Sequence, residues 1–583
     1  MKQIQSKQKL TVWNSIIILL SIAGLIVCVP VLFPQVRCMI LDYVMQVFHR
    51  ETIMYESWSK VLLSFSMGGI CLILLFNYCV LTGSGRTLVK KVKQDIIACL
   101  SEIDFRPLLK PVLIMSGIYL LGILAIIRAD FSYMDDIWHS VNGGRAWYNW
   151  SRYVTMLLTY IIHPEIRITD NSPLPQLLTV VILACSSVLL VYITGNRKIT
   201  TVRLLASIPL GLSPYFLECL SYKFDAPYMA LSVISGIIPF LFIARKKAFI
   251  FCSVIALLIM CMTYQAASGI YLLIVILLCF QDWNNRSKSN KEIMSFLCTA
   301  ALAFCIAMLI FKIFIMRTVG TYVSNEMYTA SQLISGILNN IKNYVIIING
   351  DLGVIWKAGI ALVVLFFITK SIVQSSQKKL YSFLMSVAVI GILFILSYGI
   401  YLLLARPLFT PRGMLGFGAF LSIICIYVVS NYKKTAIIAV LALNWCFFVF
   451  AFSYGNALAD QKRYAEFRVT LLLHDLSSIQ FNRNIEDTSI QLQNSIGFAP
   501  TVKNISKNYP VIEKLVHIRL GMETDMHYNG VYFRIHFDYN CKTNISWMEG
   551  YTDYRTLDLP VVIDSYYHTI QSDGERVLVT LKR

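Results

Sequence analysis

Charged residues are scarce in this chain, and their scarcity excludes most soluble folds. Only 14% of the 583 residues are Asp, Glu, Lys or Arg, whereas 57% are hydrophobic and the mean hydropathy is +0.64. A soluble domain of this size cannot bury so much apolar side-chain surface. The composition therefore predicts a polytopic membrane protein.

Several chemical signatures are also missing. The chain has no HExxH motif, no Cys/His cluster and no glycine-rich loop that could cradle a phosphate, so no metal, nucleotide or other cofactor is predicted. Its 15 cysteines lie mostly inside apolar runs and lack the close spacing of metal ligands, which is typical of small core residues. The region after residue 455 has one cysteine, Cys541, which cannot form an internal disulfide there. No internal repeat or low-complexity tract is visible.

The 32 acidic residues are outnumbered by 51 lysines and arginines, and the formal net charge is +19. Nucleic-acid binding would require the basic residues to gather on one soluble face, but they occur in short clusters between apolar runs. The positive-inside rule instead places these clusters in the cytoplasm, together with the N-terminus. The clusters comprise Lys2, Lys7 and Lys9; Arg86, Lys90, Lys91 and Lys93; Arg197 and Lys198; Arg245, Lys246 and Lys247; Lys378 and Lys379; and Lys433 and Lys434.

Apolar runs of roughly 16 to 24 residues match a hydrocarbon core about 30 Å thick, and they predict helices because a β-barrel would show short alternating segments. We predict about thirteen transmembrane helices in an all-α membrane fold. Their ranges are Val12 to Phe33, Trp58 to Leu81, Pro111 to Ile127, Leu177 to Thr194, Val202 to Leu217, Tyr228 to Ile243, Ala248 to Met262, Ser268 to Phe280, Ile293 to Met316, Val354 to Thr369, Tyr381 to Leu404, Met414 to Val429 and Thr435 to Tyr454. The first run is too long for a signal-peptide core and is predicted to be retained.

After residue 455 the composition becomes that of an ordinary soluble domain. The segment ADQKRYAEFRVTLLLHDLSSI has apolar residues at helical spacing, whereas GVYFRIHF and VLVTL alternate like strands. Ser572, Asp573 and Gly574 indicate a hairpin turn. An odd number of spans puts this region outside the cytoplasm. We therefore predict three regions: an N-terminal two-helix extension (1–110), a transmembrane catalytic core (111–455) and a small periplasmic α+β domain (456–583).

The segment ADFSYMDDIWHSVNGGRAWYNWSRY, which we call the acidic loop, directly follows the third predicted span. Asp135 and Asp136 point about 100° apart on a helix, so only one of them is expected to face a substrate. With Tyr133, Trp138 and Trp147 nearby, a carboxylate could take a proton from a sugar hydroxyl while aromatic rings hold the sugar. An acidic helix cap with interfacial aromatic side chains fits the same residues equally well.

Arginines occur on the predicted external side, against the positive-inside trend. They are Arg145, Arg152, Arg406 and Arg412. Their guanidinium groups could converge on a phosphate at the outer leaflet, because the guanidinium fork matches phosphate geometry. Snorkelling to the interface is the commoner fate of a single arginine beside a span. Four such residues on one side favour the phosphate site modestly.

Two further external loops carry polar residues that could line the same cleft. The loop ECLSYKFDAPY contributes Glu218, Lys223 and Asp225, although a structural pair between Lys223 and Asp225 fits equally well. Tyr264 and Gln265 interrupt an apolar stretch, where a phenol and an amide could bind a sugar or only complete a turn.

Three segments carry a resemblance to a known family: YMDDIWHSVNGGRAWYNWSRY, SPYFLECLSYKFDAPYMALSV and TYQAASGIYLLI. In them the chain resembles the Gtr-type, glucosyltransferase II-like family of bacterial O-antigen-modifying enzymes, which belong to the GT-C class of membrane glycosyltransferases. The likeness covers roughly Pro111 to Phe280 and more loosely the later helices and NALADQKRYAEF. It implies transfer of a sugar, commonly glucose, from a polyprenyl-phosphate carrier to a surface glycan outside the bacterial inner membrane.

The resemblance also implies roles for individual residues. Asp135 and Asp136 form the acidic motif, in which one carboxylate is the general base on the acceptor hydroxyl, without a metal and with inversion at the anomeric carbon. We expect Asp135 to be the base and Asp136 to orient it or replace it. Arg145 and one arginine of the pair Arg406 and Arg412 are expected near the donor phosphate.

The resemblance implies partners outside the chain as well. These are the lipid bilayer, the polyprenyl-phosphate-linked donor, lipopolysaccharide or another surface glycan as acceptor, and a donor synthase and a flippase that supply the donor.

Two features depart from the family pattern. The family usually has Gly-Arg-Pro where this chain has Gly144, Arg145 and Ala146. Its acidic loop normally follows the first helix, whereas residues 1–110 precede it here.

The main alternative is a transporter or a lipid-linked-sugar flippase. Ion-coupled transporters place ionisable groups near the bilayer midplane and show related halves. In this sequence the middle of the spans lacks acids, and the candidate residues crowd one interface. The distribution of charge therefore favours the enzyme.

Overall fold

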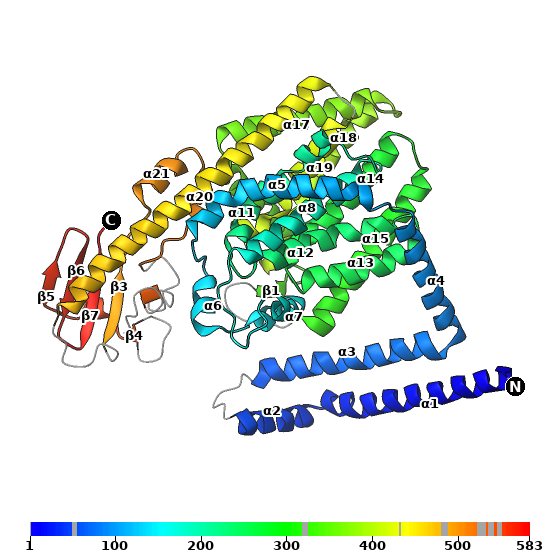
Figure 1. Ribbon diagram of the computed structural model, residues 1–583, viewed down its shortest axis with the longest axis horizontal. Coiled ribbons are helices and arrows are strands. Elements are labelled where there is room, and N and C mark those ends of the chain that lie inside the picture. The colour runs from blue at the N-terminus through cyan, green and yellow to red at the C-terminus, as the bar shows by residue number, and fades with distance from the viewer. Residues whose placement is uncertain are drawn as a thin grey trace.

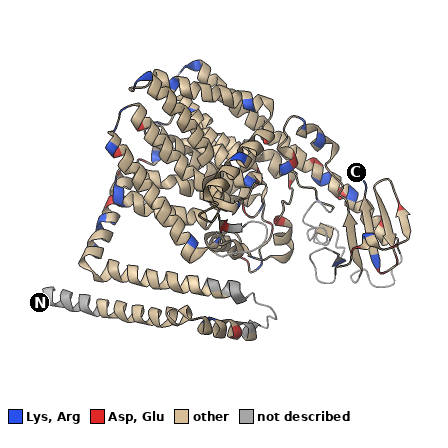
Figure 2. Ribbon diagram, turned by 180° about the vertical axis from the view of Figure 1, so that it is seen from behind, with Lys and Arg blue, Asp and Glu red and all other residues tan. Residues whose placement is uncertain are grey.

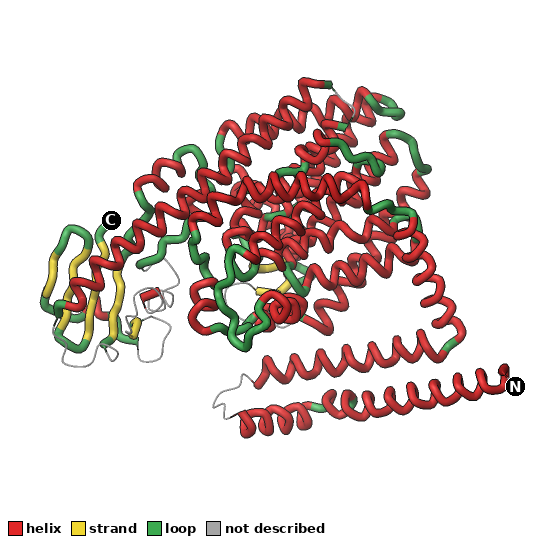
Figure 3. Tube along the Cα trace, in the orientation of Figure 1, coloured by secondary structure: helices red, strands yellow, loops and turns green. Residues whose placement is uncertain are grey.

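The computed structural model describes residues 2–48, 55–316, 324–430, 433–479, 488–521, 532–533, 542–544 and 551–583. Helices dominate, and the strands are confined to a small pair beside the helical bundle and to a sheet near the C-terminus (Figure 3). Figure 2 shows charged residues mainly at helix ends, in loops and along the C-terminal region. The fold is thus built on apolar helices, as the composition predicts.

The N-terminal helices lie along one side of the main bundle, to which α4 connects them (Figure 1), and Phe65 contacts Tyr153 of the bundle edge-on. This group comprises α1 (Lys2–Cys28), η1 (Pro30–Leu32), α2 (Pro34–Phe48), α3 (Tyr55–Leu81) and α4 (Gly83–Ser101). The apolar windows of α1 and α3 are each only 6% buried inside the protein. Such side chains need lipid around them, because water would not solvate that much apolar surface.

The bundle begins with α5 (Arg106–Ala129), α6 (Asp136–Asn142), η2 (Trp147–Trp150), α7 (Tyr153–Ile162), α8 (Leu174–Thr194), α9 (Thr201–Ala206), α10 (Pro209–Leu212), α11 (Pro214–Ser221), α12 (Ala226–Ile237) and η3 (Ile238–Phe242). It continues with α13 (Lys246–Cys261), η4 (Gln265–Ala267), α14 (Ser268–Asn284), α15 (Asn290–Ile310), the π-helix η5 (Phe311–Ile315), α16 (Leu333–Asp351), α17 (Val354–Val373), α18 (Lys379–Leu396), η6 (Gly399–Leu403), η7 (Pro411–Met414) and α19 (Gly416–Val429). A short antiparallel pair joins β1 (Ser324–Met327) to β2 (Leu404–Arg406).

Ten helices in the described residues are long and apolar enough to cross a membrane. They become eleven if Thr201–Leu212 and Pro214–Ser221, which meet at a 61° bend, form one broken span. Two further predicted runs form shorter apolar helices, Ala226–Phe242 and the 16-residue α13. The helical polytopic class is therefore confirmed, whereas the total of thirteen spans stays a prediction.

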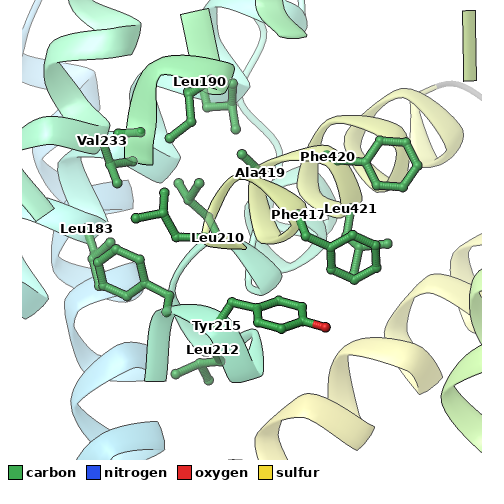
Figure 4. Close-up of a cluster of buried hydrophobic side chains, with 14 of the residues drawn as sticks. Leu183, Leu190, Leu210, Leu212, Tyr215, Val233, Phe417, Ala419, Phe420 and Leu421 are labelled. Atoms are coloured by element: carbon green, nitrogen blue, oxygen red, sulfur yellow. The ribbon is translucent and has the colours of Figure 1, made fainter. Parts of the chain in front are cut away.

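The centre of the bundle is an apolar cluster around α19, all of whose membrane-length window is buried. Leu183 and Leu190 of α8, Leu210, Tyr215 of α11 and Phe417 of α19 lie together there (Figure 4). This packing positions α11 relative to the start of α19, with the rings of Tyr215 and Phe417 in edge-on contact. Helix α11 carries Glu218, and η7, which directly precedes α19, carries Arg412.

Helix α20 (Lys434–Ser477) runs 44 residues without a break from the bundle to the C-terminal sheet (Figure 1). It packs along α5 at Gly455, where any side chain would collide with the backbone of Ala125. Beyond that point Ala465, Val469 and Leu472 recur on one face and enter the apolar core of the sheet. The helical spacing predicted after residue 455 is confirmed, and the predicted region boundary falls within this helix.

The C-terminal region contains a five-stranded mixed sheet in the order β4-β3-β7-β6-β5. Its elements are β3 (Ser489–Gln493), α21 (Pro500–Ser506), α22 (Ile512–Leu515), β4 (Lys542–Thr543), η9 (Tyr554–Thr556), β5 (Val561–Asp564), β6 (His568–Ser572) and β7 (Arg576–Leu581). The predicted strand VLVTL and its hairpin turn are confirmed by the antiparallel pair β6 and β7. The predicted strand GVYFRIHF, like Cys541, lies largely or wholly outside the described residues.

Candidate functional site

Asp136 is the buried member of the acid pair. It is the first residue of α6, and none of its surface is exposed. Its Oδ2 accepts hydrogen bonds from the backbone N–H groups of Tyr133, at 2.7 Å, and Lys223, at 3.0 Å. Burial raises the pKa of Asp136 well above its usual value, while these two donors act in the opposite direction. Asp136 thereby ties the acidic loop to the loop between α11 and α12.

Asp135 has the opposite environment, because it is exposed at the residue before α6. It makes no side-chain cap to the helix. Its negative charge acts on Tyr222, which lies in the loop after α11. The two adjacent acids therefore differ as helical geometry predicts: one faces outward beside an aromatic ring, and the other faces the protein interior.

Glu218 and Arg412 form a buried ion pair beside the acidic loop. Glu218 lies in α11 and is 1% exposed, and its Oε1 is 2.9 Å from Nη1 of Arg412 in η7. The backbone N–H of Arg412 also donates to this carboxylate. The guanidinium carbon lies 5.5 Å from the ring centroid of Tyr222, and Nη1 is 3.5 Å from Sδ of Met134. The carboxylate thus fixes the orientation of Arg412 next to the acid pair.

Lys223 joins three segments through its side chain. Its Nζ lies 2.5 Å from Oδ1 of Asp130 and 2.9 Å from Oδ2 of Asp170. Partial burial by itself would raise the pKa of Asp130, but hydrogen bonds from Lys223 and Lys462 outweigh it and hold the pKa below its usual value. The alternative pairing of Lys223 with Asp225 is wrong, because Lys223 binds these two other acids.

Asp225 instead holds two residues of the acidic loop. Its Oδ1 accepts a hydrogen bond of 2.6 Å from Nε1 of Trp147 and lies 3.6 Å from Nη1 of Arg152. The Trp147 ring stacks on His139, with ring centroids 4.6 Å apart. Trp138 also contacts the His139 ring edge-on, with ring centroids 5.2 Å apart. These contacts give the tryptophans and Asp225 structural roles in the loop.

Arg152 and Tyr264 are the second cation and aromatic pair of the site. The guanidinium of Arg152 lies 4.9 Å from the centroid of the Tyr264 ring. Within the described residues, the buried Nε of Arg152 and Oη of Tyr264 have no hydrogen-bond partner. The charges of Arg152 and Arg412 both act on Tyr264, so the two predicted arginines lie near one phenol. Gln265 follows as the first residue of η4 and is half-buried.

Two other predicted arginines lie elsewhere. Both Nη atoms of Arg145 donate to backbone carbonyls, those of His163, Glu165 and Ile166, within 2.6 to 2.7 Å. Arg145 therefore braces the loop between α7 and α8. Arg406 is exposed on β2. Their predicted contact with a donor phosphate stays a prediction.

The C-terminal region reaches the site through a segment that the sequence did not indicate. Tyr133 Oη donates to the carbonyl of Leu515, at 2.9 Å, and Tyr454 of α20 donates to the same carbonyl at 3.3 Å. The ring of His517 lies 4.7 Å from that of Tyr133. Burial lowers the pKa of His517 to about 3, with Arg519 and Arg412 adding to the effect, so His517 is neutral at pH 7.

Other contributors were missed for identifiable reasons. Asp130 lies three residues beyond the predicted third span, and this position at the interface was a usable signal, whereas Asp170 carries no sequence pattern of its own. Nothing in the local sequence links residue 515 to Tyr133, because that contact spans 382 positions.

Within the described part of the chain, no three His, Cys, Asp or Glu residues are grouped so that they could hold a metal ion.

Asp136→Ala tests the structural role of the buried acid. The substitution leaves the buried N–H groups of Tyr133 and Lys223 without their acceptor, so we expect the free energy of unfolding to fall by about 2 to 4 kcal/mol. Thermal unfolding of the purified protein in a neutral detergent measures this. Asp135→Ala is the matched control, and as a surface change it should alter stability by less than about 0.5 kcal/mol. Equal losses in the two variants would contradict the assignment.

The fold and the site together define a polytopic membrane protein in which acids, arginines and aromatic rings from several loops meet at one end of the helical bundle. Residues 124–423, slightly more than half of the chain, match the family model of the glucosyl transferase GtrII. The chain belongs to this family, which implies that it is a glycosyltransferase. The matched region includes Asp135, Asp136, Glu218 and Arg412.

A curated relative supports the same assignment. A protein of Salmonella phage P22, described as an uncharacterized 55.3 kDa protein in the gtrB 5' region, is 24% identical over 427 residues. The alignment covers 69% of this chain and 85% of the phage protein. No solved structure matches the chain.

Proposed function

We propose that this protein transfers a hexose, most directly glucose, from a polyprenyl-phosphate-linked donor to a surface glycan such as the O-antigen. The reaction takes place on the periplasmic face of the bacterial inner membrane. The observation that carries this proposal is the pairing of an exposed Asp135 with a fully buried Asp136, next to Arg412 and Tyr222. This arrangement supplies an accessible base beside a cation that can bind phosphate.

Asp135 is the general base in this mechanism. Its carboxylate takes the proton of the acceptor hydroxyl while the hydroxyl oxygen attacks the anomeric carbon of the donor sugar. The bond from that carbon to the phosphate oxygen breaks, and its electron pair leaves with the polyprenyl phosphate. A single displacement of this kind inverts the anomeric centre. Asp136 is a positioning residue, since its hydrogen bonds to Tyr133 and Lys223 hold the turn that presents Asp135.

Arg412 and Arg152 stabilise the departing phosphate. A guanidinium group presents several N–H donors in a fixed plane, and its charge offsets the charge that develops on the leaving oxygen. Two buried carboxylates orient these arginines: Oε1 of Glu218 lies 2.9 Å from Nη1 of Arg412, and Oδ1 of Asp225 lies 3.6 Å from Nη1 of Arg152. No metal takes part in the proposed step. Tyr264, with its phenol beside both arginines, contacts the sugar or the phosphate.

The proposed partners follow from the substrates. The donor has a polyprenyl tail that lies in the bilayer, and the acceptor is lipopolysaccharide or another surface glycan. The phage relative is described by its position in the gtrB 5' region. This fits a protein that works with the products of neighbouring genes, such as a donor synthase and a flippase.

Mass spectrometry of surface polysaccharide tests the function directly. Cells that produce the protein should carry glycan repeats heavier by one hexose, and cells without it should lack this mass. Cells with Asp135→Asn should resemble the cells without the protein, while Glu165→Gln, an exposed acid on the loop after α7, should resemble wild type. An unchanged glycan with the protein present in the membrane would favour the transporter or flippase.

A further inference from the structure

A cavity with a partly polar lining lies at the end of the helical bundle opposite the candidate site. It has a volume of about 580 Å³ and is lined by the ends of α8, α14, α17 and α19 together with the start of α9. Helix α14 begins four residues after Tyr264 of the candidate site and ends at this cavity. Its 17 residues span about 25 Å, so the cavity and the candidate site are separated by nearly the thickness of the hydrocarbon core.

Two buried cations face this cavity. Lys370 of α17 is 3% exposed, and its Nζ donates to the carbonyls of Tyr427 and Ser430 at the end of α19. Arg203 of α9 is 7% exposed, and its Nη1 donates to the carbonyls of Gly195 and Lys198 after α8, at 2.9 and 2.8 Å. Both side chains thus bind carbonyl groups at or just after the ends of helices, where the negative end of the helix dipole favours a cation.

The cavity has a surplus of positive charge. Arg197 and Lys288 also line it. Each of these two has one acidic partner, because Asp282 of the lining is 2.8 Å from Lys288 and Glu102 is 3.7 Å from Arg197, which leaves the charges of Lys370 and Arg203 in excess. Within the described residues, neither Lys370 nor Arg203 has a carboxylate within salt-bridge distance. Carbonyl dipoles offset a buried charge only in part, so an anion in the cavity would stabilise both cations.

We propose that this cavity binds a phosphate group, carried either by an anionic lipid or by a small soluble molecule. Four cationic side chains supply the charge, and the guanidinium groups of Arg197 and Arg203 supply paired donors. Phe240, Leu241 and Leu278 line the same space and would contact the apolar part of an amphiphile. This site is separate from the proposed transfer of a hexose and does not depend on it.

The test uses the full-length protein, purified in a neutral detergent and freed of lipid. The probes are dioctanoyl phosphatidic acid, dioctanoylglycerol, which lacks only the phosphate, and inorganic phosphate, each at matched ionic strength. Binding is measured as the apparent Kd and as the shift in thermal unfolding. We expect phosphatidic acid to bind and raise the unfolding temperature, and dioctanoylglycerol to do neither.

Variants locate the binding site. Lys370→Met keeps the length of the side chain but removes its charge, and should weaken the apparent Kd roughly tenfold or more. Lys288→Gln, on an exposed loop, should weaken the apparent affinity for phosphatidic acid several-fold. If Lys370→Met does not fold, this second variant tests whether the phosphate binds in the cavity. Lys357→Met is the control: Lys357 is exposed near the other end of the same helix, α17, and its loss should leave the Kd unchanged.

The outcomes separate the sources of phosphate. Binding of phosphatidic acid alone identifies a lipid, and equally strong binding of inorganic phosphate identifies a small soluble anion. No binding of either probe above the matched-salt control overturns the proposal. Binding that stays unchanged in both Lys370→Met and Lys288→Gln also overturns it, because the phosphate would then lie elsewhere.

Discussion

Asp135→Asn is expected to reduce hexose transfer about 10²- to 10⁴-fold while the protein still folds and enters the membrane. Asparagine keeps the size and exposure of the side chain but cannot accept the proton of the acceptor hydroxyl. The rate is measured with purified protein and a polyprenyl-phosphate-linked glucose, with product formation followed by mass spectrometry. Asp135→Glu should retain more activity than Asp135→Asn, because a displaced carboxylate can still accept a proton.

Glu165→Gln is the control for this experiment, since it converts an exposed acid into its amide on the neighbouring loop. Its backbone carbonyl, which accepts from Arg145 at 2.7 Å, is unaffected by the substitution. The control should retain full activity. Full activity in Asp135→Asn would refute its role as the base, and the same assay on Asp136→Asn would then show whether the buried acid carries the reaction.

The sequence predicted the helical class and most helix positions because hydrophobic length is a local property. Leu177 to Thr194, for instance, corresponds to α8, which ends at the predicted residue. The predicted end of the last span at Tyr454 was wrong as a helix boundary, because α20 continues to Ser477. Polar residues after Tyr454 end the apolar run without ending the helix, since the distal half of α20 buries Ala465 and Val469 in the core of the sheet.

The candidate site was predicted by residue type but not by its internal pairing. The prediction that Asp135 and Asp136 face different ways needed only the helical angle between neighbours. That Asp136 accepts hydrogen bonds from the backbone of Lys223 depends on two loops 87 residues apart. The partners of Lys223 likewise come from positions 130 and 170, so only the folded chain reveals them.

Arg412→Lys is expected to lower kcat/KM for the lipid-linked donor about 10²-fold with little loss of stability. Lysine preserves the positive charge next to Glu218 but lacks the planar fork that binds two phosphate oxygens at once. Arg463→Lys is the matched control, because the Arg463 side chain is 75% exposed on α20, and its activity should change less than about threefold. Equal losses in the two variants would contradict a special role for Arg412.

A double variant separates catalysis by Arg412 from the stability of its ion pair. Arg412→Gln alone leaves the Glu218 carboxylate, which is 1% exposed, without its cation, and should cost about 3 to 5 kcal/mol of stability. Adding Glu218→Gln removes the unpaired charge and should restore most of that stability, because two amides can hydrogen-bond at the 2.9 Å separation of the original pair. Hexose transfer should stay low in the double variant, since the Arg412 guanidinium is gone and Arg152 alone remains to stabilise the leaving phosphate. If activity returned with stability, Arg412 would act only through folding, and the phosphate would have to be bound by Arg152.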